Sequence, residues 1–166
     1  NNKCIHLFEY SNNNDINFNI KYNLDMASSL IISKFYYNNK CNEVVNISLN
    51  KRGANIKYNF SSISNNDNFY KINVYHLDNN TSSDVFNRIV AKENSSNYFD
   101  INSYVDNGIK DCYLNQSTKI VTLGDSDNRV NPNMFISEED VTAIHSSTIG
   151  SINEEDLFYL MSRGIS

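Results

Sequence analysis

The chain alternates apolar and polar residues in short runs, and this period of two is typical of half-buried β-strands. The clearest run is INFNIKYNL, residues 16–24, which places its apolar side chains on one face and Asn and Lys on the other. VNISL at residues 45–49 and IKYNF at residues 56–60 show the same alternation. Weaker runs predict further strands at residues 72–77, 85–90, 98–105, 109–114, 120–123, 134–136 and 141–144.

The turns between these runs favour a parallel coil of strands over a sheet built from hairpins. Tight antiparallel turns favour Asn-Gly or Asp-Gly, and Asn107-Gly108 is the single such pair in the sequence. The runs also follow one another too closely for helical crossovers. We therefore predict an all-β fold over residues 1–150, a single-stranded parallel β-helix with about two strands per coil. A sandwich or barrel is the alternative.

The inward face of this predicted coil follows from the alternation. Ile16, Phe18, Ile20, Tyr58 and Phe60 are expected to point into the core. Asparagine makes up roughly a fifth of the residues. Because Asn tolerates positive φ, it is expected to fill turn positions that glycine fills elsewhere. Stacked Asn side chains at repeated turn positions are expected to pair through their amides.

The last segment changes to helical spacing. In SINEEDLFYLMSRG, Leu157, Leu160 and Met161 recur at the i, i+3, i+4 spacing of one helix face. The acidic residues 154–156 suit the positive start of a helix, and Gly164 suits its end. Residues 151–166 are therefore predicted to begin a helical region. A short helix is marginal alone, so we expect this one to fold back on the last coil.

Composition narrows the classes of function. The chain has 166 residues and a formal net charge of −5, and its longest basic run is Lys51-Arg52. Phosphate contacts need clustered cations, so no nucleic-acid partner is expected. No stretch approaches the roughly 18 apolar residues of a membrane span, so no membrane partner is expected either. The sequence starts without methionine and is expected to be a fragment or a processed product.

The common catalytic and metal-binding motifs are missing from the sequence. It contains no phosphate-binding loop, GxSxG, HExxH or CxxC. Cys4, Cys41 and Cys112 are far apart and are interpreted as ordinary thiols. The acidic residues 138–140 would alternate between the two faces of a strand, so they are interpreted as a solvated edge and not as a metal cluster. GDSDN at residues 124–128 lacks the distal glutamate of a calcium loop.

The three histidines differ in their surroundings. His6 and His76 lie in strand-like runs and are interpreted as packed or surface residues. His145 stands between the last predicted strand and the predicted helix. Its position makes it the histidine whose role most needs an explanation.

The segment around His145 resembles a known family. DVTAIHSSTIGSINEEDLFYLMSRGI is similar to DVxCxHGATVGxLDEExLFYLxSRGI of the SufB/SufD family, the scaffold subunits of Suf iron–sulfur cluster assembly. HLDNNTSS at residues 76–83 resembles HxxPxTxS without its proline. RIVAKENSSNYFDINSYVDNGIKDCYLNQ resembles RGxxxGxxxxxFxGxIxVxxxAxxTDAxQ, and NPNMFI resembles xPxLEI. The similarity covers residues 76–166, whereas residues 1–75 match only in strand rhythm.

Two positions relate the chain to one branch of that family. Ser146 follows the histidine where SufB has a glutamate, and Thr118 stands where SufB has a cysteine. The resemblance is therefore closest to SufD. It implies a right-handed parallel β-helix followed by a C-terminal helical region, of which residues 151–166 would be the start.

The resemblance also implies a function. It implies a non-catalytic scaffold subunit that pairs with SufB through the end of the β-helix and docks the SufC ATPase. His145 matches a SufD histidine at the interface where clusters are assembled, and imidazole suits iron ligation or proton transfer. Leu157, Phe158, Tyr159 and Arg163 are the implied interface or SufC-docking residues. No tightly bound cofactor is expected, only transient iron or an iron–sulfur cluster in the complex.

Other interpretations stay open at this point. A SufB-like paralogue would act as the cluster scaffold itself, and the isolated core could form a homodimer. A β-helix polysaccharide lyase would need convergent carboxylates, whereas the acids here are scattered. A β-solenoid adhesin would be extracellular, and three unpaired cysteines and the C-terminal motif count against it. The Asn-rich composition suits an AT-rich parasite genome. It favours a plastid or apicoplast stroma over bacterial cytoplasm, with any transit peptide preceding residue 1.

Overall fold

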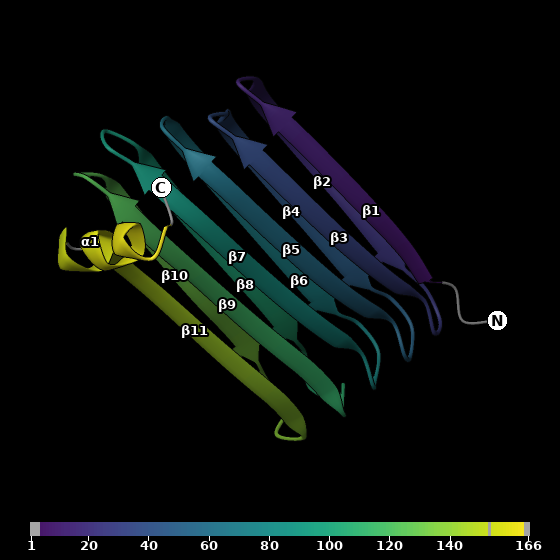
Figure 1. Cartoon of the computed structure of the whole chain (residues 1–166). Helices are drawn as coiled ribbons and strands as arrows, with labels where there is room; N and C mark the ends of the chain where they lie inside the picture. Colours follow the sequence, from purple (N-terminus) through teal and green to yellow (C-terminus); the bar gives the residue numbers. More distant parts are fainter. Residues whose placement is uncertain (1–3, 153, 165–166) are drawn as a thin grey trace.

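The computed structural model describes residues 4–152 and 154–164, and its strands coil into two parallel sheets (Figure 1). Sheet A has the order β1-β3-β5-β7-β9-β11, and sheet B has the order β10-β8-β6-β4-β2. The chain passes alternately from one sheet to the other, so successive coils stack into a parallel β-solenoid. Its strands are β1 (Cys4–Asn12), β2 (Asp15–Leu24), β3 (Ser29–Tyr37), β4 (Lys40–Leu49), β5 (Asn55–Ser64), β6 (Asp67–His76), β7 (Ser82–Lys92), β8 (Ser96–Val105), β9 (Cys112–Leu123), β10 (Asp127–Ile136) and β11 (Val141–Ser151).

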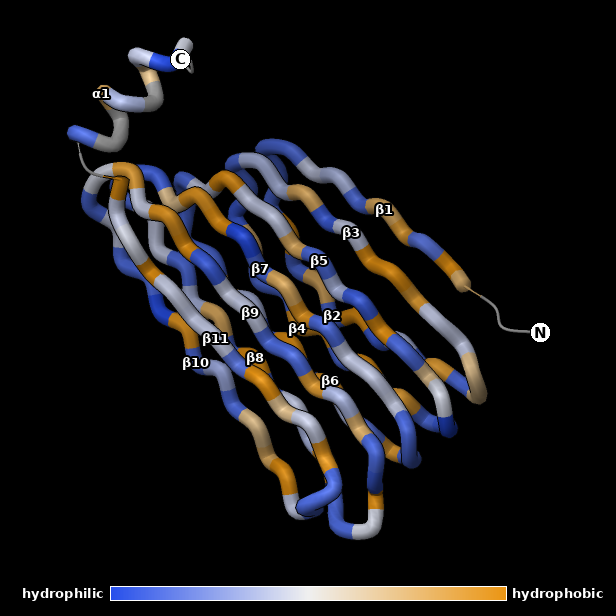
Figure 2. The backbone as a smooth tube through the Cα atoms, turned by 60° about the horizontal axis from the view of Figure 1, so that its bottom comes forward, coloured by the Kyte–Doolittle hydropathy of each residue, from blue (hydrophilic) through white to orange (hydrophobic). Residues whose placement is uncertain are grey.

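The core lies between the two sheets, where every second side chain of the middle strands is buried. Figure 2 shows this alternation of hydrophobic and hydrophilic residues along the strands. Tyr58 and Phe60 of β5 are each only 1% exposed. The Phe60 ring centroid lies 5.3 Å from that of Tyr36 and 4.8 Å from that of Tyr70. Each such side chain contributes roughly 1.5–3 kcal/mol by burial, so the alternation itself stabilises the coil.

In the first coil, β1 and β2, the inward side chains follow the same alternation but are more exposed than those of the later coils. Leu7 is in register with Ile32, which is 1% exposed, yet Leu7 is 41% exposed. Phe18 is in register with the buried Glu43 and is 50% exposed. Of the inward residues expected from the sequence, Ile16, Tyr58 and Phe60 are buried as predicted, Ile20 is partly exposed, and Phe18 is exposed. The difference arises because, within the described residues, no strand stacks beyond β1 and β2.

Asparagine ladders run along the solenoid. On the outer face of sheet B, Asn46, Asn73, Asn102 and Asn133 each donate an amide N–H to the Asn of the preceding coil, starting from Asn19, over 2.9–3.3 Å. The three inner amides, Asn46, Asn73 and Asn102, therefore serve as both donor and acceptor, as in stacked parallel strands. Asn side chains thus pair from coil to coil as expected, but this ladder lies on strands and not at the turn positions that were predicted.

Asparagine also occupies turns, as the sequence predicts. Asn13, Asn38, Asn80 and Asn94 have φ between 51° and 61°, and they are four of the six described non-glycine residues with positive φ. This left-handed region costs most residues energy, and Asn tolerates it because its short amide bonds locally to the backbone. The scarcity of glycine in the chain is therefore compatible with its many turns.

A charged pair lies inside the apolar core near the first coil. The Lys34 ammonium of β3 bonds the Glu43 carboxylate of β4, and the two side chains are 0% and 1% exposed. Glu9 of β1 lies 3.3 Å from the same ammonium and accepts a bond from the Tyr36 hydroxyl. Burial would lower the pKa of Lys34, but the Glu43 and Glu9 carboxylates outweigh it and raise that pKa. Nothing in the alternation of the sequence predicts this pair.

The helix α1 (Glu154–Ser162) extends from the end of the solenoid (Figure 2). Phe158 is 75% exposed, Tyr159 58% and Met161 59%. The helix itself was predicted. Of the three apolar side chains expected to fold back on the last coil, Met161 is exposed, and those of Leu157 and Leu160 lie outside the described residues. Within the described residues, no helix is both long and apolar enough to cross a membrane.

Strand bounds differ from the sequence prediction in several places. Most strands are longer than predicted: β4 begins at Lys40, β6 at Asp67 and β10 at Asp127. β1 and β3 were not predicted, because SLIISKFYY puts three apolar residues in a row and hides its period of two. The runs at 109–114 and 120–123 belong largely to one strand, β9, preceded by a turn at Asn107-Gly108. Gly108 has φ of 86°, which suits glycine, but this turn joins the two sheets and forms no hairpin.

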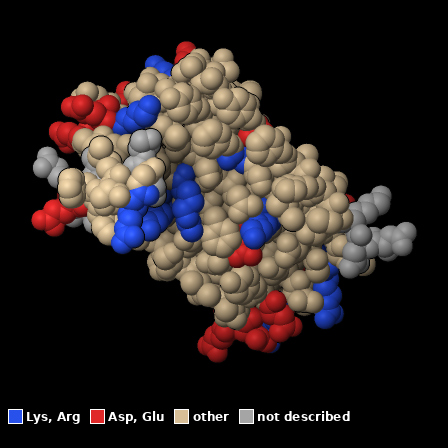
Figure 3. Space-filling view, viewed as in Figure 1, with Lys and Arg blue, Asp and Glu red and all other residues tan. Residues whose placement is uncertain are grey.

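Charged residues are unevenly distributed over the surface. Figure 3 shows Asp and Glu side chains mainly towards the rims of the molecule, and Lys and Arg side chains on the broad face beside α1. The whole chain carries a net charge of −5, so the positive charges on this face contrast with the negative net charge of the molecule.

Candidate functional site at the free end of sheet A

His145 lies on β11, at the end of sheet A. It is in register with Gln116 of β9, whose side chain points inward and is 1% exposed. Register partners share a face, so His145 also belongs to the inward row of the core. Within the described residues no strand follows β11 in sheet A, and His145 is exposed. The site is therefore an imidazole at the open end of the core, next to an unpaired strand edge.

The interior behind His145 is polar. The Gln116 amide donates to the Ser103 hydroxyl over 2.8 Å and to the Asn133 carbonyl over 3.2 Å. One coil deeper, the Asn87 amide donates to the Thr118 hydroxyl over 3.0 Å. Among the described residues, the side-chain oxygens of Gln116 and Asn87 are buried without a hydrogen-bond partner. Such groups are costly unless water or another donor reaches them.

Two serines flank the histidine and point to opposite faces. Ser147 is in register with the buried Thr118, so it lies on the inward side with His145. Ser146 is in register with Ser117 on the outer face of sheet A. The Ser147 hydroxyl therefore lies on the same face of β11 as the His145 imidazole. Ser146 lies on the opposite face of the strand.

The chemistry available at this end is limited to what one imidazole can do. Neutral imidazole donates one nitrogen to iron or carries one proton near neutral pH. Within the described residues, no three His, Cys, Asp or Glu side chains gather closely enough to hold a metal ion. His145 alone thus offers a single ligand, and any iron held there needs further ligands from another molecule.

The motif around His76 has a structural explanation. The His76 ring bonds the Thr81 hydroxyl over 2.8 Å and the Ser83 hydroxyl over 2.9 Å, and it is 1% exposed. Burial lowers the pKa of His76 to about 4, so the ring is neutral near pH 7. These three residues are the His, Thr and Ser of HLDNNTSS. They tie the end of β6 to the start of β7 and are interpreted as structural.

The predicted docking residues on α1 are separate from His145, which lies on β11. Phe158 and Tyr159 are exposed, and the Arg163 guanidinium lies 5.3 Å from the centroid of the Tyr159 ring. The side chain of Leu157 lies outside the described residues. The structure thus presents aromatic and cationic side chains to solvent on α1, while His145 lies in the body of β11.

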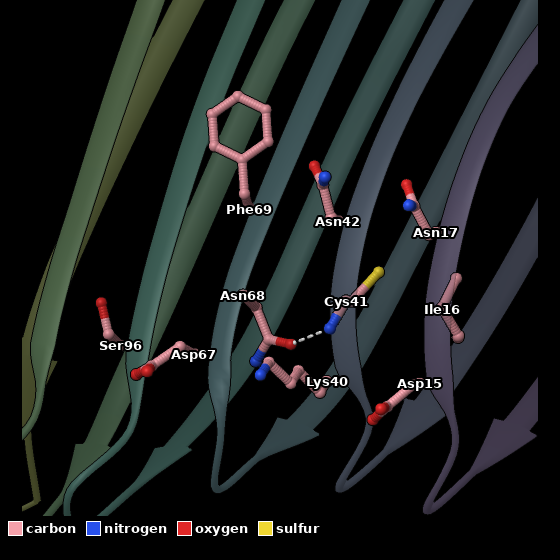
Figure 4. Close-up of a pocket in the computed structure, with 10 residues that line it drawn as sticks. All are labelled: Asp15, Ile16, Asn17, Lys40, Cys41, Asn42, Asp67, Asn68, Phe69 and Ser96. Carbon is pink, nitrogen blue, oxygen red and sulfur yellow. Dashed lines mark hydrogen bonds between the residues drawn. The ribbon is translucent and has the colours of Figure 1, made fainter.

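The hollow shown in Figure 4 lies elsewhere, at the starts of β2, β4, β6 and β8. Asp15, Lys40 and Asp67 line it in successive coils with Phe69. Cys41 also lines it, but burial and the Glu43 carboxylate raise the pKa of this thiol to about 12. A protonated, 3% exposed thiol is a poor nucleophile and a poor metal ligand. We therefore assign no chemistry to this hollow.

Gln116 was missed as a site residue by the sequence interpretation. Its signal was present, because it is the last residue of the segment that resembles a family stretch ending in Q. Placing it beneath His145 requires the register between β9 and β11, in which partners are 29 residues apart, as Gln116 and His145 show. The alternation within single strands does not give this spacing.

The fold and the site at β11 define a class of protein, the parallel β-solenoids whose last coil has polar side chains such as Gln116 in its interior. Within that class the chain belongs to the SufB/SufD family, because the model of the SUF system FeS cluster assembly SufBD core domain matches residues 11–166. The family resemblance seen in the sequence is therefore confirmed, and with it the parallel β-solenoid fold.

A curated relative points to one branch. The iron–sulfur cluster assembly protein SufD of Bacillus subtilis (strain 168) is 32% identical over 77 residues. That alignment covers 46% of this chain and 18% of the relative. The aligned part thus spans less than a fifth of that protein's length, and the match supports a member of the family that is most like SufD.

Proposed function

We propose that this chain is a scaffold subunit of the Suf iron–sulfur cluster assembly complex, that it has no catalytic activity of its own, and that it pairs with SufB and docks the SufC ATPase. The observation that carries the proposal is the position of His145. The residue that matches the SufD histidine lies on β11, and within residues 4–152 and 154–164 no further strand pairs with the outer edge of β11. A free parallel edge is a surface that another strand can join.

Pairing at this end would complete the site. His145 supplies one nitrogen, and a second solenoid placed against β11 would bring further ligands to iron or to a nascent cluster. The polar interior around Gln116 would then face the joint between the two solenoids. Iron or a cluster is the cargo in this proposal, held transiently and shared with the partner.

SufC docking is assigned to the region that α1 begins. Phe158, Tyr159 and Arg163 are exposed there, and aromatic and Arg side chains are enriched where proteins bind tightly. For the cell compartment, we propose a plastid or apicoplast stroma from the Asn-rich composition, with bacterial cytoplasm as the other choice.

The test is reconstitution with SufB and SufC, followed by iron and sulfide analysis of the purified complex. His145→Ala is expected to leave assembly of the complex intact and to lower the cluster content severalfold, because an exposed ring is removed without a core cavity. His6→Ala is the matched control, since His6 is also an exposed strand histidine but lies on β1. Equal cluster content in the His145→Ala complex and the His6→Ala complex would reduce His145 to a structural residue.

Two other outcomes bear on the role of the chain. Failure of the chain to co-purify with SufB and SufC would contradict the scaffold proposal itself. Cluster assembly by the chain and SufC without SufB would favour a SufB-like role, in which this chain is the cluster scaffold. Ser146 and Thr118 count against that second role, because SufB has glutamate and cysteine there.

A further inference from the structure

The outer face of sheet A carries an apolar row that the proposed function does not use. Tyr37, Ile63, Val90 and Val121 are register partners in β3, β5, β7 and β9, and each is partly exposed. We call this row the sheet A stripe. At its end on β11 stands Gly150, over which a Cβ would meet nothing within 4 Å. The stripe lines part of a surface hollow of about 330 Å³.

Cations border the stripe. Arg88 and Lys119 line the same hollow, and the Lys92 ammonium lies 5.2 Å from the centroid of the Tyr37 ring. Within the described residues, none of these three cations forms an ion pair. An apolar row bordered by cations suits a ligand that combines apolar side chains with carboxylates.

The helix α1 has that chemistry. Its first turn is Glu154-Glu155-Asp156, and its exposed apolar side chains include Phe158 and Met161. Nine residues span about 13.5 Å at 1.5 Å per residue. Strands lie about 4.8 Å apart, so the same length crosses about three strand spacings. The helix therefore matches the stripe in sign of charge, in polarity and in length.

We propose that the sheet A stripe is the docking surface for α1 of a second copy of this chain, so that two copies exchange their helices. Each helix extends from its own solenoid (Figure 2). Its Phe158 side chain is 75% exposed and is thus available to a neighbour. Exchange forms two equal contacts and covers both stripes. It uses the same exposed side chains of α1 as the proposed SufC contact, so the two contacts exclude each other. In the exchanged pair the Glu155 carboxylate lies against the Lys119 ammonium, which orients the helix across the strands.

The first test measures mass against concentration by light scattering. The wild-type chain shifts from monomer towards dimer as its concentration rises, whereas Val121→Asp remains monomeric over the same range. Val44→Asp is the matched control, because Val44 is a partly exposed valine on the outer face of sheet B. Circular dichroism checks that both variants fold. A Val121→Asp chain that dimerises like the control would overturn the proposal.

The second test identifies the occupant in trans. A Val121→Cys variant and a Phe158→Cys variant, each with Cys4→Ser, are mixed and oxidised. Cys41 and Cys112 are buried and do not compete. A disulfide-linked pair of the two variants is expected, and Lys119→Glu in the first variant lowers its yield at least about tenfold, with partial recovery when the second carries Glu155→Lys. No mixed pair, or a disulfide only within one chain that carries both cysteines, overturns the proposal. Neither measurement depends on SufB, SufC or iron.

Discussion

The buried pair Lys34–Glu43 makes a sharp prediction about stability. In the wild-type chain the two charges compensate each other in the core, with side chains 0% and 1% exposed. Lys34→Met keeps the apolar stem and removes the ammonium, which leaves the Glu43 carboxylate buried and uncompensated. Breaking one side of such a pair costs roughly 3–5 kcal/mol. Glu9 offsets none of this loss, because it is a second carboxylate near the same ammonium.

The double substitution Lys34→Met with Glu43→Leu is expected to recover most of that loss. Replacing a buried ion pair by apolar residues of similar volume is often neutral or stabilising by roughly 1–4 kcal/mol. Val45, two residues along β4, is already buried in an apolar setting, so the core around Glu43 accepts such a side chain. The assay is urea unfolding of the wild type, the two single variants and the double variant, analysed as a double-mutant cycle.

The pH dependence of the Lys34→Met variant follows from Glu43. Burial raises the pKa of Glu43 above its usual range, although Lys34 opposes this. Without Lys34 the pKa of Glu43 rises further, so the folded state binds a proton that the unfolded state releases. Stability of the variant is then greatest at acidic pH and falls by up to about 1.4 kcal/mol per pH unit as pH rises through the folded-state pKa. A cost that is independent of pH, or equal in the double variant, would refute this reasoning.

Three further outcomes test other parts of the fold. Burial lowers the pKa of His76 to about 4, so the folded state favours the neutral ring. The wild-type chain should therefore lose about 3 kcal/mol of stability as pH falls from the ordinary histidine pKa near 6.5 to 4. His76→Gln should abolish this loss. Calorimetry of both chains between pH 4 and 7 checks this. Asn102→Ala should cost about 1–2 kcal/mol in urea unfolding, since it removes one bond to Asn73 and one from Asn133; no change would show that the ladder is neutral. Asn94→Gly should keep the wild-type stability while Asn94→Ala loses about 1 kcal/mol, because φ is 61° there; equal melting temperatures of the two variants would contradict this.

Much of the fold was predictable from the sequence because its causes are local. The alternation in residues 16–24 gives β2 within one residue, and the shortage of hairpin dipeptides gives parallel coiling. β3 escaped prediction because Ile31 faces outward between the buried Leu30 and Ile32, so both faces of the strand carry apolar side chains there. The period of two is visible only when the faces differ in polarity.

The candidate site was predictable in part. His145 stood out from its position and from the family resemblance, and the structure adds that its row continues inward to Gln116. The pair Lys34–Glu43 and the neighbourhood of Gln116 join residues of different strands, and they depend on how the sheets face each other. Single-strand patterns carry no information about such contacts. The open position of α1 was also missed, because an apolar helix face shows that cover is needed but not where it comes from.

The stacking of coils has a consequence for how the molecule opens. Each inner strand is bonded only to the strands one coil before and one coil after it, so cooperativity is a nearest-neighbour property along a single axis. Terminal coils have one neighbour and fray at the lowest free energy, whereas the middle of the stack opens last. His145 therefore stands on one of the least protected strands of the chain. A protein that binds along β11 would add one more strand to the stack. It would slow amide hydrogen exchange in β11 before it slows exchange in the other strands, so binding would be detected first as a local loss of motion.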